Sequence, residues 1–138
     1  MTGSLPLSGN RAIEDAAVAF VVRWESDHGR PAEDTRGRGA AADVASRGRT
    51  IEVKAYGQFS RGQELWLEPR QKVEAASNPD FWIYVVENVR QGDPANFRLI
   101  QIGGDDLQRL MQRAVERRYF TVPWPVAAYD ALIVEPPT

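Results

Sequence analysis

Two acids and one lysine stand in the spacing D-x8-E-x-K, at Asp43, Glu52 and Lys54. If Arg47-Gly48 forms a two-residue hairpin turn, Asp43 lies directly opposite Glu52 on the neighbouring strand. Facing residues of an antiparallel pair have Cβ atoms about 4.5–5.5 Å apart and point to the same side of the sheet. Lys54 is two residues beyond Glu52, so it projects from that side as well. The spacing therefore predicts one sheet face that carries two carboxylates and an ammonium group.

Two facing carboxylates repel each other unless a cation compensates their charge. A hard divalent ion, Mg²⁺ or Mn²⁺, suits such a pair, because Mg²⁺ binds through one or two carboxylates together with water and phosphate oxygens. The ion can polarise a phosphate and activate a water, while Lys54 orients or deprotonates that water or neutralises developing charge. The pattern indicates metal-dependent phosphodiester hydrolysis. The alternative is an exposed sheet face on which Lys54 forms a salt bridge with both acids.

Two further observations bear on this site. Of the 17 basic residues only Lys54 and Lys72 are lysines, so a lysine at this position is unusual for a chain that otherwise uses arginine. An ammonium group titrates more readily than a guanidinium, which favours chemistry. Glu14 lies at the edge of the apolar stripe of its expected helix, from which a carboxylate can reach over the sheet. A solvated position beside Asp15 is equally consistent with that spacing.

Basic residues gather around the candidate site. The net charge of the chain is −2, yet residues 30–72 contain nine basic and six acidic side chains. If Asp43 and Glu52 bind metal, the remaining surface of this segment is positive and suits a phosphate backbone, with DNA favoured over RNA. The residues that we expect at nucleic acid are Arg47, Arg49, Arg61, Arg70, Gln71 and Lys72. For any one of them, a solvated surface position is the plain alternative.

The composition excludes several other classes of site. The chain has 138 residues, of which 43% are hydrophobic and 26% charged, as in one globular domain. There is no cysteine and His28 is the only histidine, which excludes disulfides, a Cys/His zinc site and a Ser-His-Asp triad. The sequence shows neither a signal peptide nor an apolar stretch long enough for a membrane span, so we expect a cytoplasmic protein without a membrane partner.

Periodicity and turn signals predict an α/β (α+β) fold, a mixed β-sheet flanked by helices in the order α-β-β-β-α-β-β-α. We expect a flexible segment at residues 1–9 and a single domain at 10–138. The expected helices are Asn10–His28, Pro69–Ala76 and Asp105–Arg118. The expected strands are Ala41–Ala45, Thr50–Tyr56, Gln63–Leu67, the buried Phe81–Val89 and Phe97–Ile102, with a further candidate at Ala131–Val134. Arg30–Gly39 reads as a loop.

Five short blocks resemble the C-terminal domain of NO VEIN proteins, a domain of unknown biochemical function that is usually considered restriction-endonuclease-like. They are Asn10–Glu14, Ala42–Val44, Ile51–Lys54, Leu67–Ala76 and Phe81–Val86. The resemblance implies the PD-(D/E)xK superfamily, with Asp43, Glu52, Lys54 and the helix acid Glu14 as catalytic residues. It also implies that Asp43, Glu52 and Val53 hold the metal.

Two functions from different classes therefore follow. The first is a metal-dependent nuclease that cleaves DNA, a reaction that would fit a defence or repair system. The second is a module on the same fold that binds nucleic acid or assembles with proteins without turnover. The sequence leaves open a homodimer or a separate targeting protein as a partner.

Overall fold

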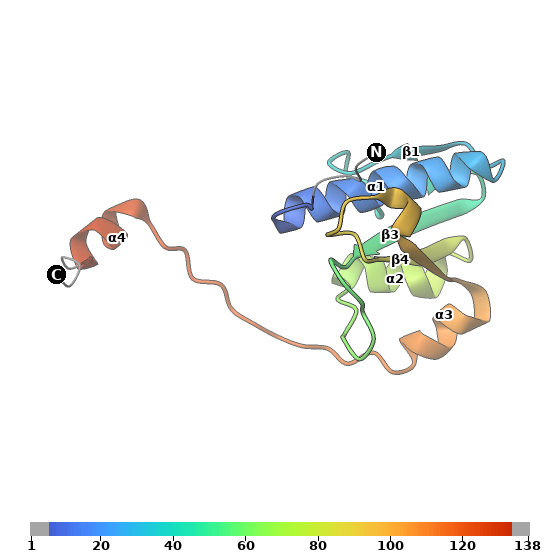
Figure 1. Ribbon diagram of the computed structural model, residues 1–138. Helices are drawn as coiled ribbons and strands as arrows, with labels where there is room; N and C mark the ends of the chain where they lie inside the picture. The colour runs from blue at the N-terminus through green and yellow to red at the C-terminus, as the bar shows by residue number, and fades with distance from the viewer. Residues whose placement is uncertain (1–5, 134–138) are drawn as a thin grey trace.

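The protein is built on one five-stranded mixed sheet with the strand order β1-β2-β3-β4-β5. The structure, a computed structural model, describes residues 6–133 (Figure 1). The strands are β1 (Ala32–Asp34), β2 (Val44–Ser46), β3 (Arg49–Ala55), β4 (Phe81–Glu87) and β5 (Arg98–Ile102). The pair β3–β4 is parallel and the other three pairs are antiparallel. The expected mixed α/β architecture is thus confirmed.

Helices cover both faces of this sheet (Figure 1). Helix α1 (Asn10–Asp27) lies on one face, and α2 (Pro69–Ser77) and α3 (Gly104–Met111) lie on the other. Helix α4 (Val126–Leu132) lies away from the sheet (Figure 1), and a 3₁₀ turn, η1 (Pro94–Asn96), precedes β5. None of the helices within residues 6–133 is both long and apolar enough to cross a membrane.

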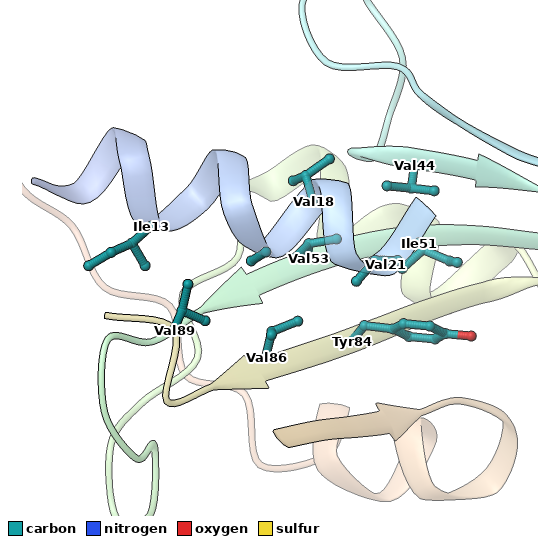
Figure 2. Close-up of a cluster of buried hydrophobic side chains, with 10 residues drawn as sticks. Ile13, Val18, Val21, Val44, Ile51, Val53, Tyr84, Val86 and Val89 are labelled. Carbon is teal, nitrogen blue, oxygen red and sulfur yellow. The ribbon is translucent and has the colours of Figure 1, made fainter. Parts of the chain in front are cut away.

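Strand β4 joins the two cores, because its side chains alternate between the faces of the sheet. Tyr84 and Val86 pack with α1, in a cluster that contains Ile13 and Val21 (Figure 2). On the other face, the alternate residues of β4 pack with Ala75 of α2 and Leu107 of α3. The nearly continuous apolar run of this strand is therefore explained by burial on both sides.

The β2–β3 hairpin has the expected register. Ser46 pairs with Arg49, and Val44 pairs with Ile51. Gly48, at the second position of the turn, has φ of +74°, a conformation that glycine adopts without steric cost. The two-residue turn predicted from the sequence is therefore confirmed.

One predicted strand is wrong and one strand was missed. Residues 63–67 form no strand; Leu65 and Leu67 instead pack from a loop against the core below α2. The missing strand is β1, which lies within the segment expected to be a loop, Arg30–Gly39, and pairs with β2. Its residues Ala-Glu-Asp carry no apolar alternation, and only pairing with β2 makes them a strand. The order of the first eight helices and strands is the same because one error offsets the other, and α4 is an additional helix.

The C-terminal part also differs from expectation. Helix α3 ends at Met111 instead of Arg118, because Leu107 is its only buried residue and no core lies beyond it to support further turns. The candidate strand Ala131–Val134 is wrong over residues 131–132, which end helix α4, and Val134 lies outside the described residues. Residues 1–5 of the expected flexible segment are outside them too.

A buried carboxylate ties α1 to the sheet. Glu25 is 0% exposed and accepts two hydrogen bonds of 2.7 Å from Arg30, one of 2.8 Å from Ser46 and one of 2.9 Å from the Tyr84 hydroxyl. Burial alone would raise the pKa of Glu25, but the hydrogen bonds from Arg30, Ser46 and Tyr84 together lower it. The charge is therefore well compensated, and we assign Glu25 a structural role.

We predict that Glu25→Gln lowers the free energy of unfolding by about 2–4 kcal/mol at pH 7, because an amide cannot satisfy this set of donors. The folded-state pKa of Glu25 lies below its ordinary value of 4.5, so its contribution is present above that pH and is lost as the pH falls. Urea titrations at pH 7 and pH 4 measure the difference. The matched control Asp27→Asn, on the exposed side of α1, should change stability by less than about 0.5 kcal/mol. Equal effects of the two substitutions would contradict the structural role.

Candidate functional site

Asp43 directly precedes β2, and its side chain continues the hydrogen bonding of the sheet. Its N–H donates to the Ile51 carbonyl at 3.1 Å, and its carboxylate accepts a 3.0 Å hydrogen bond from the Val53 N–H. Its carbonyl accepts from Thr35 N–H at 2.8 Å. The Asp43 carboxylate is therefore held against the edge of β3 by its own hydrogen bond.

This geometry corrects one detail of the prediction. We expected Asp43 inside a strand, Ala41–Ala45, directly opposite Glu52, but β2 begins at Val44 and the last ladder pair is Val44–Ile51. The chain bends over residues 41–43. The bend places Ala42 in the core below α2, whereas Val44 belongs to the core under α1.

Glu52 and Lys54 project from β3 toward the face covered by α2 and α3, because Ile51 and Val53 between them belong to the core under α1. Lys54 Nζ lies 3.1 Å from Glu52 Oε2. Glu52 is only 5% exposed, and the Lys54 side chain is 18% exposed. The other carboxylate oxygen, Glu52 Oε1, is buried and has no hydrogen-bond partner in the described part of the chain.

The two carboxyl groups are close enough to change each other's titration. Burial and, after it, the charge of Asp43 raise the pKa of Glu52 to about 7, against the opposing effect of Lys54. Burial also raises the pKa of Asp43, against the lowering effect of the Val53 N–H, Glu52 and Lys54, while Glu14 adds to the rise. The structure thus brings Asp43, Glu52 and Lys54 together, in an environment that disfavours two negative charges without a further cation.

The donor set fits a hard divalent cation. An unpartnered buried carboxylate oxygen, a second carboxylate beside it and a shortage of positive charge are what such an ion would satisfy. The N–H and C=O of one residue in an extended strand point the same way. Because the Val53 N–H reaches Asp43, the Val53 carbonyl faces the same edge of β3. Asp43, Glu52 and the Val53 carbonyl would therefore hold the ion.

Within residues 6–133, no group of three or more His, Cys, Asp or Glu side chains could hold a metal. Two carboxylates with one carbonyl leave several positions for water and substrate oxygens, which is typical of Mg²⁺.

Glu14 lies near this site but is held by another partner. Its carboxylate is 3.4 Å from Arg36 Nη1, and Arg36 also binds Asp15 and Asp34, each at 2.8 Å. These side chains border a hollow of about 730 Å³ between α1 and the loop after β1, and this hollow includes none of Asp43, Glu52 and Lys54. Glu14 therefore influences the pKa of Asp43 through its charge, without joining the carboxylate pair. Arg36 was missed from the sequence, because two of its three partners, Glu14 and Asp15, are distant in the chain.

Arg49 is engaged away from the carboxylate pair. Its guanidinium lies 4.0 Å from the centre of the Trp82 ring and donates to the Tyr84 hydroxyl and, at 2.9 Å, to Gln101 Oε1. Trp82 packs on the core under α1, so Arg49 is on the opposite face of the sheet from Glu52. A role of Arg49 in holding β3, β4 and β5 together accounts for these contacts.

The other five residues that we expect at nucleic acid differ in whether their side chains already bind another part of the chain. Of these five, Arg47, Arg61 and Lys72 form neither a side-chain ion pair nor a side-chain hydrogen bond within the described chain. Arg70 donates to the Gly39 carbonyl and thereby ties the start of α2 to the loop before Asp43. Gln71 accepts a 3.0 Å hydrogen bond from the Glu68 N–H in the cap of α2.

A third buried carboxylate, which sequence analysis missed, anchors the loop that follows β3. Glu87, at the end of β4, accepts hydrogen bonds of 2.6 Å from both the N–H and the hydroxyl of Ser60. These bonds lower the pKa of Glu87. The Tyr56 hydroxyl donates to the Glu64 carbonyl at 3.1 Å, so the loop is fixed at two points.

We predict that Glu52→Gln raises the free energy of unfolding of the metal-free protein at pH 8, by about 1–3 kcal/mol. The folded-state pKa of Glu52 is raised from 4.5 to about 7, so its stabilising contribution is complete below pH 4.5 and is lost as the pH rises through 7. The amide removes this loss, and the advantage of the variant should disappear near pH 4.5.

Urea titrations in EDTA at pH 4.5 and pH 8 check this expectation, with the exposed Glu33→Gln as the control. A variant that is less stable than the wild type at pH 8 would show that the pair is not strained by its charge.

Comparison with known proteins identifies a family for this chain. A family model described as "Protein NO VEIN, C-terminal" matches residues 13–100, more than half of the chain. The match runs from α1 to β5 and includes Asp43, Glu52 and Lys54. No curated protein and no solved structure matches the chain. The match over residues 13–100 shows that the chain belongs to the family of the NO VEIN C-terminal domain.

Proposed function

We propose that this domain hydrolyses DNA phosphodiester bonds with Mg²⁺ or Mn²⁺ as its cofactor. The observation that carries the proposal is the buried, unpartnered Glu52 Oε1, beside the Asp43 carboxylate and with the Lys54 amine 3.1 Å from the other oxygen of Glu52. A carboxylate of this kind costs stability unless it serves a ligand. A divalent cation is the ligand that satisfies it.

Each residue then has a defined task. When bound, the metal supplies Lewis-acid polarisation of the scissile phosphate. Asp43, kept in place by the Val53 N–H, and Glu52 fix the position of the cation and hence of the substrate. The Lys54 amine, which is 18% exposed, can hold or release a proton at the attacking water and stabilise charge on the phosphate.

The proposal extends to the superfamily. A mixed sheet in which two acids and a lysine meet at the end of one hairpin supports a restriction-endonuclease-like, PD-(D/E)xK relationship. The exposed Arg47, Arg61 and Lys72 are the strongest of the expected contacts to the nucleic-acid backbone, since no other side chain engages them within the described residues. A defence or repair system is the context that we propose for such an activity.

A second function, a nucleic-acid-binding or assembly module without turnover, is favoured by one observation. Glu14, the helix acid that the resemblance assigns to the site, is paired with Arg36. A domain of this kind would bind DNA without metal, with an affinity that falls steeply as salt increases.

We predict that the purified protein cleaves DNA in the presence of Mg²⁺ or Mn²⁺ and that Asp43→Asn and Lys54→Ala each lower the rate by at least about 100-fold, because each removes a group that acts on the reacting phosphate. Plasmid, linear and single-stranded DNA should be tested, with RNA for comparison. The matched controls Asp27→Asn and Arg23→Ala alter exposed side chains of α1 and should retain wild-type activity. Equal rates for all five proteins would refute the nuclease and leave the binding module.

We also predict that Mn²⁺ stabilises the wild-type protein against thermal unfolding, by about 2.7 kcal/mol at a hundredfold excess over Kd, because only the folded state presents both carboxylates. Asp43→Asn should abolish this gain, whereas Asp27→Asn should retain it. Differential scanning fluorimetry over a Mn²⁺ series measures the shift. If the melting temperature of the wild-type protein does not change over the Mn²⁺ series, the metal site is contradicted, even if the protein binds DNA.

A further inference from the structure

The chain continues beyond the sheet domain as an arm, residues 113–133, which runs from the end of α3 to α4 and away from the sheet (Figure 1). In the described residues, no backbone hydrogen bond joins residues 115–124 to another part of the chain. Neither hydrophobic core contains a residue of the arm. The arm also lies outside the family match, which ends at residue 100.

This arm is rich in exposed apolar side chains. It supplies nine of the thirteen large hydrophobic residues that are exposed in the described chain. They are Val115, Tyr119, Phe120, Val122, Trp124, Val126, Tyr129, Leu132 and Ile133. Phe120 is 97% exposed, and Val126, Tyr129 and Leu132 follow one another at intervals of three along one side of α4. Soluble monomers rarely expose so much contiguous apolar surface, so a partner surface is indicated.

A receiving surface of matching character lies at the root of the same arm. The loop of residues 57–67 exposes Phe59 and Trp66, which are 57% and 65% accessible. Trp66 and Tyr119, together with the stems of Glu64, Arg117 and Arg118, line a hollow of about 380 Å³. An ion pair of 3.6 Å between Arg117 and Glu64 holds the arm beside it. Each copy of the chain therefore carries both an apolar arm and an apolar hollow.

We propose that two copies of this chain exchange their arms, each α4 packing against residues 57–67 and the arm root of the other copy. The contact would be isologous, so the same surface is used twice and the assembly closes as a dimer. The reach is sufficient, because the 13 residues of the segment 113–125 extend over roughly 40 Å, whereas a domain of about 100 residues has a radius of gyration near 13 Å.

Area and charge both favour a second copy as the occupant. The four aromatic side chains of one arm could bury roughly 600 Å², and two exchanged arms roughly 1,200 Å², the area of a stable specific interface. The arm root is positive, with Arg113, Arg117 and Arg118 against Glu116, whereas Asp130 is the only charged residue of α4. In an exchanged pair, the negative α4 of one copy meets the positive root of the other.

Sedimentation equilibrium of the full chain from 1 to 100 μM tests this proposal. We expect a closed dimer for the wild type and at least about 100-fold weaker dimerisation for Tyr129→Ser/Leu132→Ser, since each substitution removes an interfacial anchor. Trp66→Ser, on the receiving side, should weaken the dimer as well. Ala127→Ser/Ala131→Ser alters the opposite side of α4 and should leave it intact.

A control on folding is available, because α4 contributes to neither core of the sheet domain. Thermal unfolding followed by far-ultraviolet circular dichroism should show that the substituted proteins retain the cooperative transition of the domain. A wild-type protein that stays monomeric at 100 μM, as it would if the arm folds onto its own domain, overturns the proposal. A dimer that survives both the α4 and the Trp66 substitutions, or an open series of larger oligomers, overturns it too.

Discussion

Just before β2 begins, the Asp43 carboxylate accepts the hydrogen bond from the Val53 N–H that a further strand residue would otherwise accept. Because a charged side chain replaces a backbone acceptor here, this one hydrogen bond determines where the acidic groups of the site lie. It holds Asp43 at the edge of β3, next to Glu52, which the alternation of β3 turns inward beneath α2 and α3. It also leaves the Val53 carbonyl outside the β2–β3 ladder. A regular strand at this position would have used these backbone groups for pairing.

Glu25 and Glu52, two of the three buried glutamates in the described chain, lie on opposite faces of the sheet and differ in how their charge is compensated. We assign the first to structure and propose the second for chemistry. Glu25 has a bidentate arginine and two hydroxyl donors, and its pKa is lowered. Glu52 has one amine and an acidic neighbour, one of its oxygens has no partner, and its pKa is raised to about 7. Both side chains are removed from water, so burial does not distinguish them. The number of donors that the surrounding elements supply does.

The elements around the site are held together by hydrogen bonds and ion pairs of other side chains. Arg70 fixes the start of α2 to the loop before Asp43, Glu87 anchors the loop after β3, and Arg36 gathers the acids of α1 and β1. The domain that these contacts complete lies largely within the family match, whereas the apolar arm is an addition beyond it. Site and arm are therefore separate features of the chain, and the arm-exchange proposal stands independently of the hydrolytic one.

Local patterns in the sequence were sufficient for the elements whose stability is local or whose apolar pattern is long. The β2–β3 register follows from a two-residue turn with glycine at its second position. Helix α1 follows from apolar residues at helical spacing, and β4 follows from a nearly continuous apolar run. The common side of Glu52 and Lys54 follows from the same alternation. Tertiary structure decided the rest. The strand β1 exists because β2 offers it hydrogen bonds, and α3 ends at Met111 because its core contacts end there. The pairing of Glu14 with Arg36 and the bend at Asp43 likewise join residues that are distant or irregular in the chain, and a period carries no information about such contacts.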